Sequence, residues 1–415
     1  MTSTTQKLPY AASLPNSWEV VPLKHLATLN NGYIFKSENW ADDGTPIIRI
    51  ENLNGSEKFN YSKHPVDEKY WVHTEDLLFA WSGNPGTSFG PFRWHKPGLH
   101  FLNQHIFNVS VTGCDKNWMF WALKAATHWI ERELTSGMIG MVHVTKEDLR
   151  NVPIPIPPRE EQRRIAQFLD SEVGKIDDLL AKKRRLVMLL NERIDSRILH
   201  HVGASELVDP SSGEPAIPLR RLARKVSRAA VSDVGVITAY RDGQVTERSA
   251  RRASGYTLTA SAEPQGQHVV TGDVVVHGLD GFAGAIGTSE AEGNCSPVYH
   301  VCVPRDGQDA NFLGRLLRLL ALQGYLGNFA TSTRERALDF RNWDLFGRIP
   351  VPVIPQSEQR EIGKWIAQVK PLRAAIESSA LLAAERRQAL ITAAVTGQFD
   401  VSTASGRNVT DGVSA

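Results

Sequence analysis

The sequence predicts an α+β fold in which two similar α/β domains are separated by two long helices that pair as an antiparallel coiled coil. Two observations support this fold class. An internal repeat recurs at a spacing of about 197 residues, and each domain-sized segment is followed by a long apolar stripe at helical spacing. Because both halves share one plan, we expect a pseudo-two-fold relation between them.

Three pairs of segments carry the repeat. Pro22-Leu23 corresponds to Pro218-Leu219, residues 75–90 correspond to residues 272–287, and the segment that starts at Asp148 corresponds to the one that starts at Asp344. The offset stays within one residue although these pairs lie early, midway and late in each half. Such a constant register indicates a duplicated unit and not chance similarity.

The long helices are predicted from apolar residues spaced three and four apart, which is the pattern of a coiled-coil seam. Pro157-Pro158 and Pro355 end the preceding strands and suit helix starts. A helix of about 40 residues spans roughly 60 Å, too long to bury its stripe on one small domain, so the two helices are expected to pair. Pro371 predicts a kink or break in the second helix. The expected seam consists of Ile165, Leu169, Ile176, Leu180, Leu190, Ile194, Ile362, Ile366, Val369 and Ile376.

The domain order follows from these boundaries. We expect a flexible N-terminus (1–13), a first globular domain (14–156), a first coiled-coil helix (157–203), a linker (204–216), a second globular domain (217–354), a second coiled-coil helix (355–397) and a disordered tail (398–415). The globular segments contain short β-branched and aromatic runs bounded by Gly, Asn and Pro, which predict strands. Each also has one helical stretch late in the domain, at 118–135 and 311–329.

Composition narrows the functional classes. Three cysteines with no C-x-x-C pair argue against a disulfide framework or a zinc site and favour a reducing cytoplasm. No signal peptide or membrane span is predicted. The chain lacks the P-loop, H-E-x-x-H and G-x-S-x-G signatures, so we expect no catalytic residue, no metal and no cofactor of its own. Gly281, Gly284 and Gly287 favour a turn over a phosphate loop, because no helix is predicted after them.

Two similar but non-identical domains held at a fixed separation suit a long periodic ligand. On double-stranded DNA, the two domains would contact two short sites separated by an unread spacer, as dimer geometry sets half-site spacing in other readers. Divergence between the halves would then make the target asymmetric. The net charge of +2 permits this function but does not argue for it.

The chain resembles the specificity subunits of type I restriction–modification systems over nearly its whole length. The matching segments, in order, are LPNSWEVVPL (14–23), NGYIFKS (31–37), GTPIIRIENL (44–53), DLLFAWSG (76–83), LNQHIFNV (102–109), PIPIPPREEQRRIAQFLD (153–170) and RRQALITAAVTGQ (386–398). The second domain departs most, since HGLDGFAGAIG (277–287) replaces the usual aromatic-Ser-Gly turn. We therefore expect an atypical second half-site.

The resemblance implies a non-catalytic subunit that reads DNA for its partners. It implies assembly with two methyltransferase subunits and, in a full system, with two restriction subunits. Those partners would use S-adenosylmethionine, and ATP with Mg²⁺. The charged outer faces of the helices would be the methyltransferase dock.

Candidate DNA contacts are expected in loops and turns. The residue types are chosen because Arg and Lys suit phosphates and guanine edges, while Asn and Gln suit adenine edges. The alternative for each residue is a structural role in a turn, in the core or on a solvated face. The loop at 136–144 and the loop holding Arg334 and Arg336 are both expected to approach DNA. In the first domain the candidates are Asn31, Tyr33, Lys36, Ser37, Trp81, Ser82, Arg93, Asn103, Gln104, His143 and Lys146. In the second domain they are Arg224, Arg228, Arg241, Arg251, Arg252, Tyr256, Arg334 and Arg336.

Three alternatives stay open. A specificity subunit that serves a methyltransferase without a nuclease would have the same sequence features. A scaffold in which a coiled coil holds two adhesive domains predicts no DNA retention that depends on both salt and sequence. A fragment of a fused restriction–methylation enzyme would need catalytic motifs, and the sequence contains none of those sought.

Overall fold

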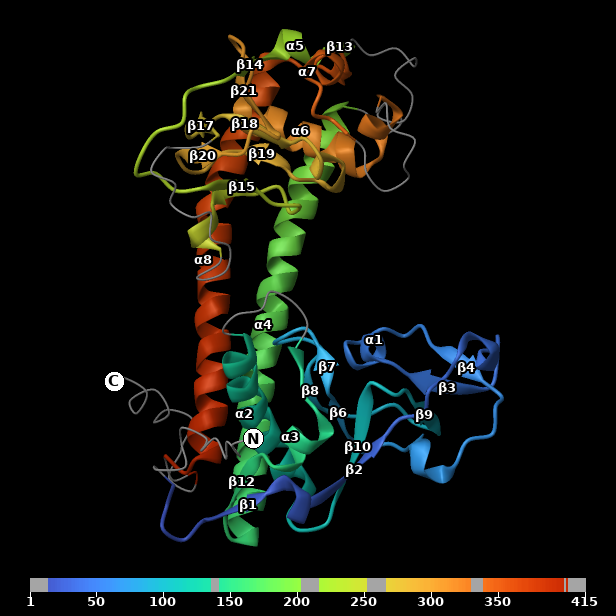
Figure 1. Cartoon of the computed structure of the whole chain (residues 1–415). Coiled ribbons are helices and arrows are strands. Elements are labelled where there is room, and N and C mark those ends of the chain that lie inside the picture. The colour runs from blue at the N-terminus through green and yellow to red at the C-terminus, as the bar shows by residue number, and fades with distance from the viewer. Residues whose placement is uncertain are drawn as a thin grey trace. The chain divides into compact units, whose positions relative to one another are not determined.

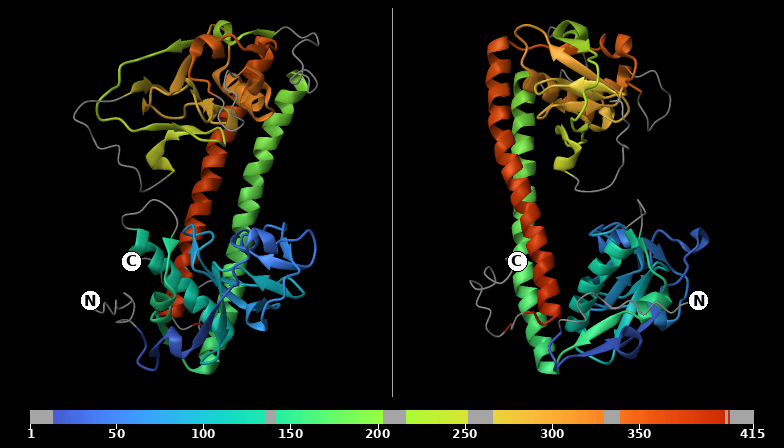
Figure 2. Two further views of the ribbon diagram at one scale, coloured as in Figure 1. Left: turned by 45° about the vertical axis from the view of Figure 1, so that its right-hand side comes forward. Right: turned by 60° about the vertical axis from the view of Figure 1, so that its left-hand side comes forward.

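A computed structural model describes residues 14–135, 142–202, 216–251, 266–329, 339–398 and 401. Within it the chain forms two compact units (Figures 1 and 2). Unit 1 comprises Met1–Ala181 and Ala380–Ala415, and unit 2 comprises Lys182–Ser379. The expected N-terminal segment, almost all of the expected linker and most of the expected tail lie outside the described residues.

The central sheet of unit 1 has the strand order β2 (Ala27–Asn31), β10 (Ile106–Val111), β6 (Leu77–Ala80) and β8 (Gly90–Arg93), and all its pairs are antiparallel. The helix α2 (Lys116–Thr135) packs against this sheet and buries Trp118 completely. β1 (Glu19–Pro22) pairs with the Pro-rich β12 (Pro153–Ile156), which leads directly to the first long helix. The 3-10 turn η1 (Leu23–His25) joins β1 to β2.

A second sheet completes unit 1, with the order β4 (Asn60–Ser62), β3 (Thr45–Ile48), β9 (His100–Leu102) and β5 (Trp71–Val72). Unit 1 also contains four short elements: η2 (Ser37–Asn39), α1 (Ile50–Leu53), η3 (Glu68–Tyr70) and α3 (Lys146–Arg150). β7 (Ser82–Gly83) pairs with β11 (Val142–His143) beyond the end of β6. This last pair brings two segments distant in sequence to one edge of the domain.

Unit 2 repeats the plan. Its central sheet has the order β14 (Ala223–Val226), β21 (Tyr299–Pro304), β18 (Val274–His277) and β19 (Ile286–Thr288), and α6 (Ala310–Leu322) packs on it. β13 (Ala216–Pro218) pairs with β22 (Pro350–Pro352). The shorter pieces are α5 (Leu219–Leu222), η4 (Arg248–Ala250), η5 (Gly281–Ala283), η6 (Tyr325–Phe329) and α7 (Trp343–Phe346).

The matching strand orders confirm the internal repeat and the α+β fold class. Even the start of the sheet-covering helix is repeated, because Asp115 and Asp309 each accept a backbone N–H three residues further on, from Trp118 and Phe312. The halves differ in the outer layer. Unit 2 has two strand pairs there, β15 (Ile237–Ala239) with β16 (Val245–Glu247) and β17 (Gln267–Val269) with β20 (Gly293–Cys295).

The two long helices are α4 (Arg159–Val202) and α8 (Gln356–Val395), and each contributes to both units. In unit 1, one apolar cluster contains Leu169 of α4, Ile391 of α8 and the domain core. In unit 2, Ile198 and Ile362 join the second domain's core in the same way. Each domain therefore buries segments of both helices.

Polar contacts in unit 2 show that its helix segments run antiparallel. Lys183 of α4 donates to Ser379 of α8 at 2.7 Å, and His201 approaches Glu358 at 2.9 Å. Residue numbers rise along one helix as they fall along the other. Of the expected seam, Ile165, Leu169, Leu180, Ile194, Ile362 and Ile366 are buried, while Ile176, Leu190, Val369 and Ile376 are half-buried.

The helix α8 runs through Pro371 without a break, so the sequence expectation of a possible break there is wrong. Proline removes one helical hydrogen bond, which normally weakens the helix at that point. Here Lys370 and Arg373, on either side of it, both contact Glu290 of the domain. These contacts hold both sides of the proline.

Among the described residues, no helix is long and apolar enough to cross a membrane, and no group of His, Cys, Asp and Glu is arranged to hold a metal ion.

Replacing Trp118 tests the packing of α2. Trp118 is fully buried, stacks edge-on against Trp18 and donates to the carbonyl of Pro155 at 3.0 Å. Trp118→Ala should destabilise unit 1 by about 3–5 kcal/mol, because it leaves a cavity and an unpaired carbonyl. Thermal unfolding of the full chain measures the loss, with the exposed Trp40→Ala as the control. Equal unfolding midpoints for the two variants would contradict this packing.

The cysteines provide a second test. Cys114, Cys295 and Cys302 are free and buried, and burial raises the pKa of each thiol to about 12. Because the thiolate is the reactive form, none should react with a thiol reagent at about pH 8 in the native protein, and all three should react after unfolding. Fast labelling of any native cysteine would overturn this expectation.

Candidate nucleic-acid interface

Several predicted contacts meet where β6 and β2 end and β10 begins. We call this group the Trp81 patch; its members are Asn31, Trp81, Ser82, Gln104, His105, His143 and Lys146. β6 ends at Ala80, immediately before Trp81, and β2 ends at Asn31. The β7–β11 pair sets Ser82 opposite His143, and Trp81 accepts the N–H of Val144 at 3.0 Å.

Trp81 is the centre of the patch. Its ring lies 4.8 Å from His143, 5.3 Å from His105 and 5.9 Å from Phe107, between ring centroids. Its Nε1–H donates to the carbonyl of Gln104 at 3.1 Å, which fixes the ring orientation. The indole is half-buried while both histidines are exposed. The patch therefore combines an aromatic base of fixed orientation with exposed polar groups at its rim.

Lys146 adds the positive charge of the patch. Its Nζ donates to Oδ1 of Asn31 at 3.3 Å and lies 6.0 Å from the Phe107 ring centroid. Thr145 caps the short helix α3, so the position of Lys146 at the first turn is set by local structure. Lys146 and Asn31 are both exposed.

A second group extends the patch along the domain. Tyr33 forms an isolated β-bridge with Asn103, next to Gln104. The Tyr33 ring packs on Phe35 and Tyr70, and its hydroxyl contacts Nε2 of His64 at 3.1 Å. Lys36 and Ser37 are exposed on the following turn.

Arg93 lies apart from these groups. Its guanidinium contacts Asp170 of α4 at 2.7 Å and lies 4.1 Å from the Phe120 ring centroid. It sits at the contact between the domain and the long helix, with 18% of its side chain exposed. The structure therefore shows a structural partner for Arg93 and does not bring it to the Trp81 patch.

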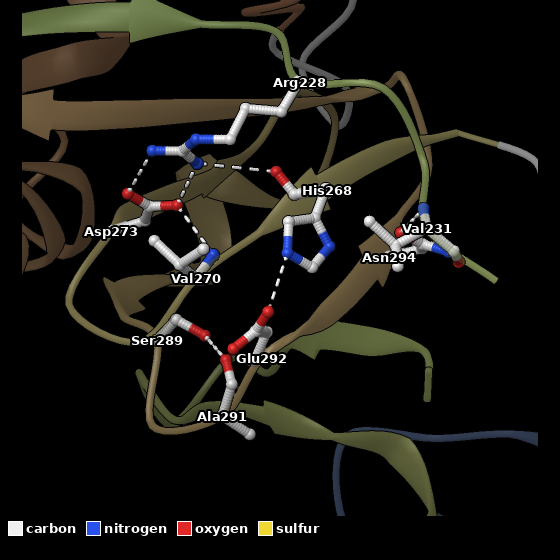
Figure 3. A network of polar contacts seen from close by, with 9 residues as sticks. All are labelled: Arg228, Val231, His268, Val270, Asp273, Ser289, Ala291, Glu292 and Asn294. Atoms are coloured by element: carbon white, nitrogen blue, oxygen red, sulfur yellow. Dashed lines mark hydrogen bonds and ion pairs between the residues drawn. The ribbon is translucent and has the colours of Figure 1, made fainter. Parts of the chain in front are cut away.

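Arg228 of the second domain also has a partner within its own unit (Figure 3). It makes a two-point contact with Asp273, at 2.5 and 3.1 Å, and Asp273 accepts the N–H of Val270 at 2.9 Å. Only 4% of the Asp273 side chain is exposed. This pair ties the loop after β14 to the start of β18.

The other predicted arginines of unit 2 differ in environment. Arg224 is exposed on β14 and has no ion pair among the described residues. Arg241 pairs with Asp280 at 2.9 Å, and Arg251 pairs with Asp242 at 2.8 Å while its guanidinium covers the Tyr240 ring. Arg252, Tyr256, Arg334 and Arg336 lie outside the described residues, as does most of the 136–144 loop.

The part of unit 2 that corresponds to the Trp81 patch has other chemistry. Phe340 donates to the carbonyl of Gly278 at 2.8 Å, as Val144 does to Trp81. His277 lies beside Tyr299, with ring centroids 4.6 Å apart, and Arg241 is held nearby through Asp280.

His277 has a defined protonation state. Burial lowers its pKa, and its Nδ1 accepts the backbone N–H groups of Leu279 and Asp280 at 3.1 and 3.0 Å. The neutral ring therefore carries its proton on Nε2, which leaves a hydrogen-bond donor.

Gly281–Ala283 forms a 3-10 turn that ends at the left-handed Gly284, so this glycine-rich segment is a turn, as expected.

Sequence reasoning missed His105, His277 and Tyr299. For His105 a signal existed, because it follows Gln104 at the turn before a predicted strand. For His277 and Tyr299 no signal was available, since only the pairing of β18 with β21 sets them opposite each other.

Comparison with known proteins agrees with this architecture. Residues 15–187 match the family model described as the type I restriction modification DNA specificity domain. The chain is 28% identical over 183 residues to the type I restriction enzyme EcoBI specificity subunit of Escherichia coli, which covers 43% of this chain and 37% of that protein. It is 25% identical over 186 residues to the type I restriction enzyme MjaVIII specificity subunit of Methanocaldococcus jannaschii, and this match covers 41% of this chain and 42% of that protein.

A solved structure of a type I restriction–modification S subunit from M. genitalium aligns over 94% of this chain and 98% of that chain, at 16% identity and a TM-score of 0.46. The sequence matches cover less than half of the curated relatives' own lengths. Residues 15–187 therefore resemble the type I restriction modification DNA specificity domain. The resemblance inferred from the sequence motifs is confirmed.

A substitution at Arg228 separates a structural role from a DNA contact. Arg228→Ala leaves the Asp273 carboxylate buried without its counter-charge, which costs 3–5 kcal/mol in a fully buried pair. Because Arg228 remains partly exposed, we expect a loss of roughly 2–3 kcal/mol in unit 2. Chemical denaturation measures it, with Arg224→Ala as the matched control. A stable Arg228→Ala chain that had lost only DNA affinity would contradict the structural assignment.

Proposed function

We propose that this chain is the DNA-specificity subunit of a type I restriction–modification complex. It reads a bipartite double-stranded target with a fixed spacer, and it directs methylation and restriction by partner subunits without catalysing either reaction. The observation that carries the proposal is the repeat: one domain topology occurs twice, and each copy is anchored on segments of the same two long helices. Because the target is genomic DNA, we place the chain in the cytoplasm.

The Trp81 patch has the chemistry of a DNA reader. The amide side chains of Asn31 and Gln104 can pair with base edges, Lys146 can neutralise a phosphate, and the exposed histidines can donate to either. The rigid indole of Trp81 holds these groups in place. We propose that Tyr33, Lys36, Ser37 and Asn103 extend this surface along the duplex.

The second domain would read a different half-site. Its corresponding surface presents His277, Arg241 and Arg341, and two of these are held by carboxylates, Arg241 by Asp280 and Arg341 by Asp339. The two arginines and their carboxylates give this surface a chemistry different from that of the Trp81 patch. This difference supports an asymmetric target, with Arg224 and the predicted residues outside the described part as further contacts.

The long helices supply surfaces for partner subunits. Besides charged groups, they expose several large apolar side chains that a partner could cover. In unit 1 these are Leu179, Leu381 and Leu382, and in unit 2 they are Leu186, Met188, Leu189 and Leu372. We propose that two methyltransferase subunits dock there, and that restriction subunits join in a full system. S-adenosylmethionine, ATP and Mg²⁺ would be bound by those partners.

The decisive experiment is a single-molecule methylome. Cells that carry this gene with its neighbouring methyltransferase are compared with cells that lack only this chain. We expect a methylated two-part motif that disappears with the deletion, and replacing residues 14–156 should change one half of that motif. An unchanged methylation pattern, with both proteins expressed, would support the adhesive scaffold instead. Whether a nuclease also takes part is decided by restriction of unmodified phage DNA.

Substitutions in the Trp81 patch distinguish reading from anchoring. Gln104→Ala should cost about 1–3 kcal/mol of discrimination at one base pair, whereas Lys146→Met should weaken binding to all sequences and reduce the salt slope by about one. Affinity of the assembled methyltransferase complex for matched and mismatched duplexes measures both effects. Lys58→Met, at an exposed position before β4, is the control. If both patch variants behave like this control, the patch does not contact DNA.

A further inference from the structure

In unit 1 an ion pair joins the domain to its following helix. Arg93, the last residue of β8, contacts Asp170 of α4 at 2.7 Å, and Trp121 of α2 donates to the same carboxylate at 2.8 Å. The guanidinium also lies over Phe120. The domain thus contributes the positive charge and the helix contributes the negative charge, with 18% of the Arg93 side chain and 38% of the Asp170 side chain exposed.

Unit 2 has an ion pair at the corresponding place. Glu290, two residues past the end of β19, contacts Arg373 of α8 at 2.9 Å and Lys370 at 3.9 Å. It also accepts a hydrogen bond from Gln244 at 3.0 Å, while Lys370 donates to Asn311 at 2.8 Å. Here the domain contributes the negative charge and the helix the positive charges.

The repeat makes this inversion meaningful. β8 and β19 hold the same position in their sheets, and α4 and α8 follow the same Pro-rich strand. At the repeat spacing, Ala367 of α8 stands where α4 has Asp170, and Val173 of α4 stands where α8 has Lys370. Neither helix therefore offers the partner that the other domain requires.

A second contact adds to the mismatch. Arg315 of α6, only 9% exposed, pairs with Asp195 of α4 at 2.5 Å. Counted from the shared helix start at Asp115 and Asp309, the residue of α2 at this position is Trp121. The two domains thus differ in charge on two of the surfaces that face the helices.

We propose that the opposite charge polarity of these two junctions determines which helix segment each domain accepts. A domain placed on the wrong segment would bury its charge without a partner. Arg93 would lie one helical turn from Lys370, and Glu290 would lie one turn from Asp170. Buried unpaired charges and like-charge contacts both disfavour such a state. The apolar seam alone does not make this distinction, because both halves use aliphatic residues there.

The functional consequence rests on the proposed function. If each domain reads one half-target, the junction charges restrict which domain can occupy the place beside each helix segment. Arg93, Asp170, Glu290, Lys370 and Arg373 are then positioning residues that hold the half-site readers in place without touching DNA.

A charge-reversal cycle in the full chain tests the unit 1 junction. Arg93→Glu and Asp170→Arg should each lower the thermal unfolding midpoint by about 5 °C, and the double variant should regain at least half of the loss. Asp170→Asn is the control, since it keeps an acceptor for Trp121 without the charge. A double variant whose loss equals the sum of the single losses would overturn the proposal.

A domain exchange tests whether each helix segment accepts only its own domain. A full-length chain with a second copy of residues 217–354 in place of residues 14–156 should unfold at a lower temperature than the wild type. Adding Val173→Lys and Ile176→Arg to α4 should raise that temperature by several degrees, whereas the same pair should destabilise the wild type. If the exchanged chain without the two added substitutions is as stable as the wild type, the proposal is refuted. If neither exchanged chain folds, the charge-reversal cycle decides.

Neither measurement requires DNA or a partner subunit, so failure here is distinguishable from failure of the proposed function. If both junction tests succeed, the wild type and the Arg93→Glu/Asp170→Arg chain should methylate the same motif. If they succeed while the methylome shows no dependence on the chain, the junction proposal stands and the DNA-reading function does not.

Discussion

The burial of each domain against segments of both long helices is the constraint on which the rest of the structure depends. The helices of 44 and 40 residues bury apolar side chains in the domain cores as well as against each other. In unit 1, Leu169 and Ile391 share one core with Trp118, and in unit 2, Ile198 and Ile362 share one with Phe312. The Pro-rich strands β12 and β22 lead each domain straight into its helix, so the domain core and the helix seam are continuous.

This arrangement explains how two related domains can diverge at one edge and remain alike elsewhere. The central sheets keep the same strand order because they must cover α2 or α6 and the helix segments. The edge beyond β6 or β18 does not have to cover a helix, so its residues can differ between the domains. There one domain places Trp81 among histidines and a lysine, and the other places His277 beside Tyr299 and a paired arginine.

Buried and exposed basic side chains have different partners in this structure. Arg93, Arg228 and Arg315 all have carboxylate partners in their own unit and are largely or partly buried, so they stabilise junctions and loops. Lys146 and Arg224 are exposed and have no carboxylate partner among the described residues, so their charges are available to a polyanion. The number of arginines in a segment therefore says little about DNA contact until the carboxylates near them are known.

The sequence by itself determined the duplication, the fold class and the two helices, because apolar periodicity and a constant repeat offset are properties of the chain order. It also singled out Asn31, Trp81, Gln104, His143 and Lys146 by residue type and turn position. Only the tertiary structure decided that these meet at one edge, since the β7–β11 pair joins segments about 60 residues apart. It likewise decided that Arg93 and Arg228 have structural partners and that α8 passes through Pro371. Each outcome depends on contacts made by residues distant in sequence, namely Asp170, Asp273 and Glu290, and no local pattern contains that information.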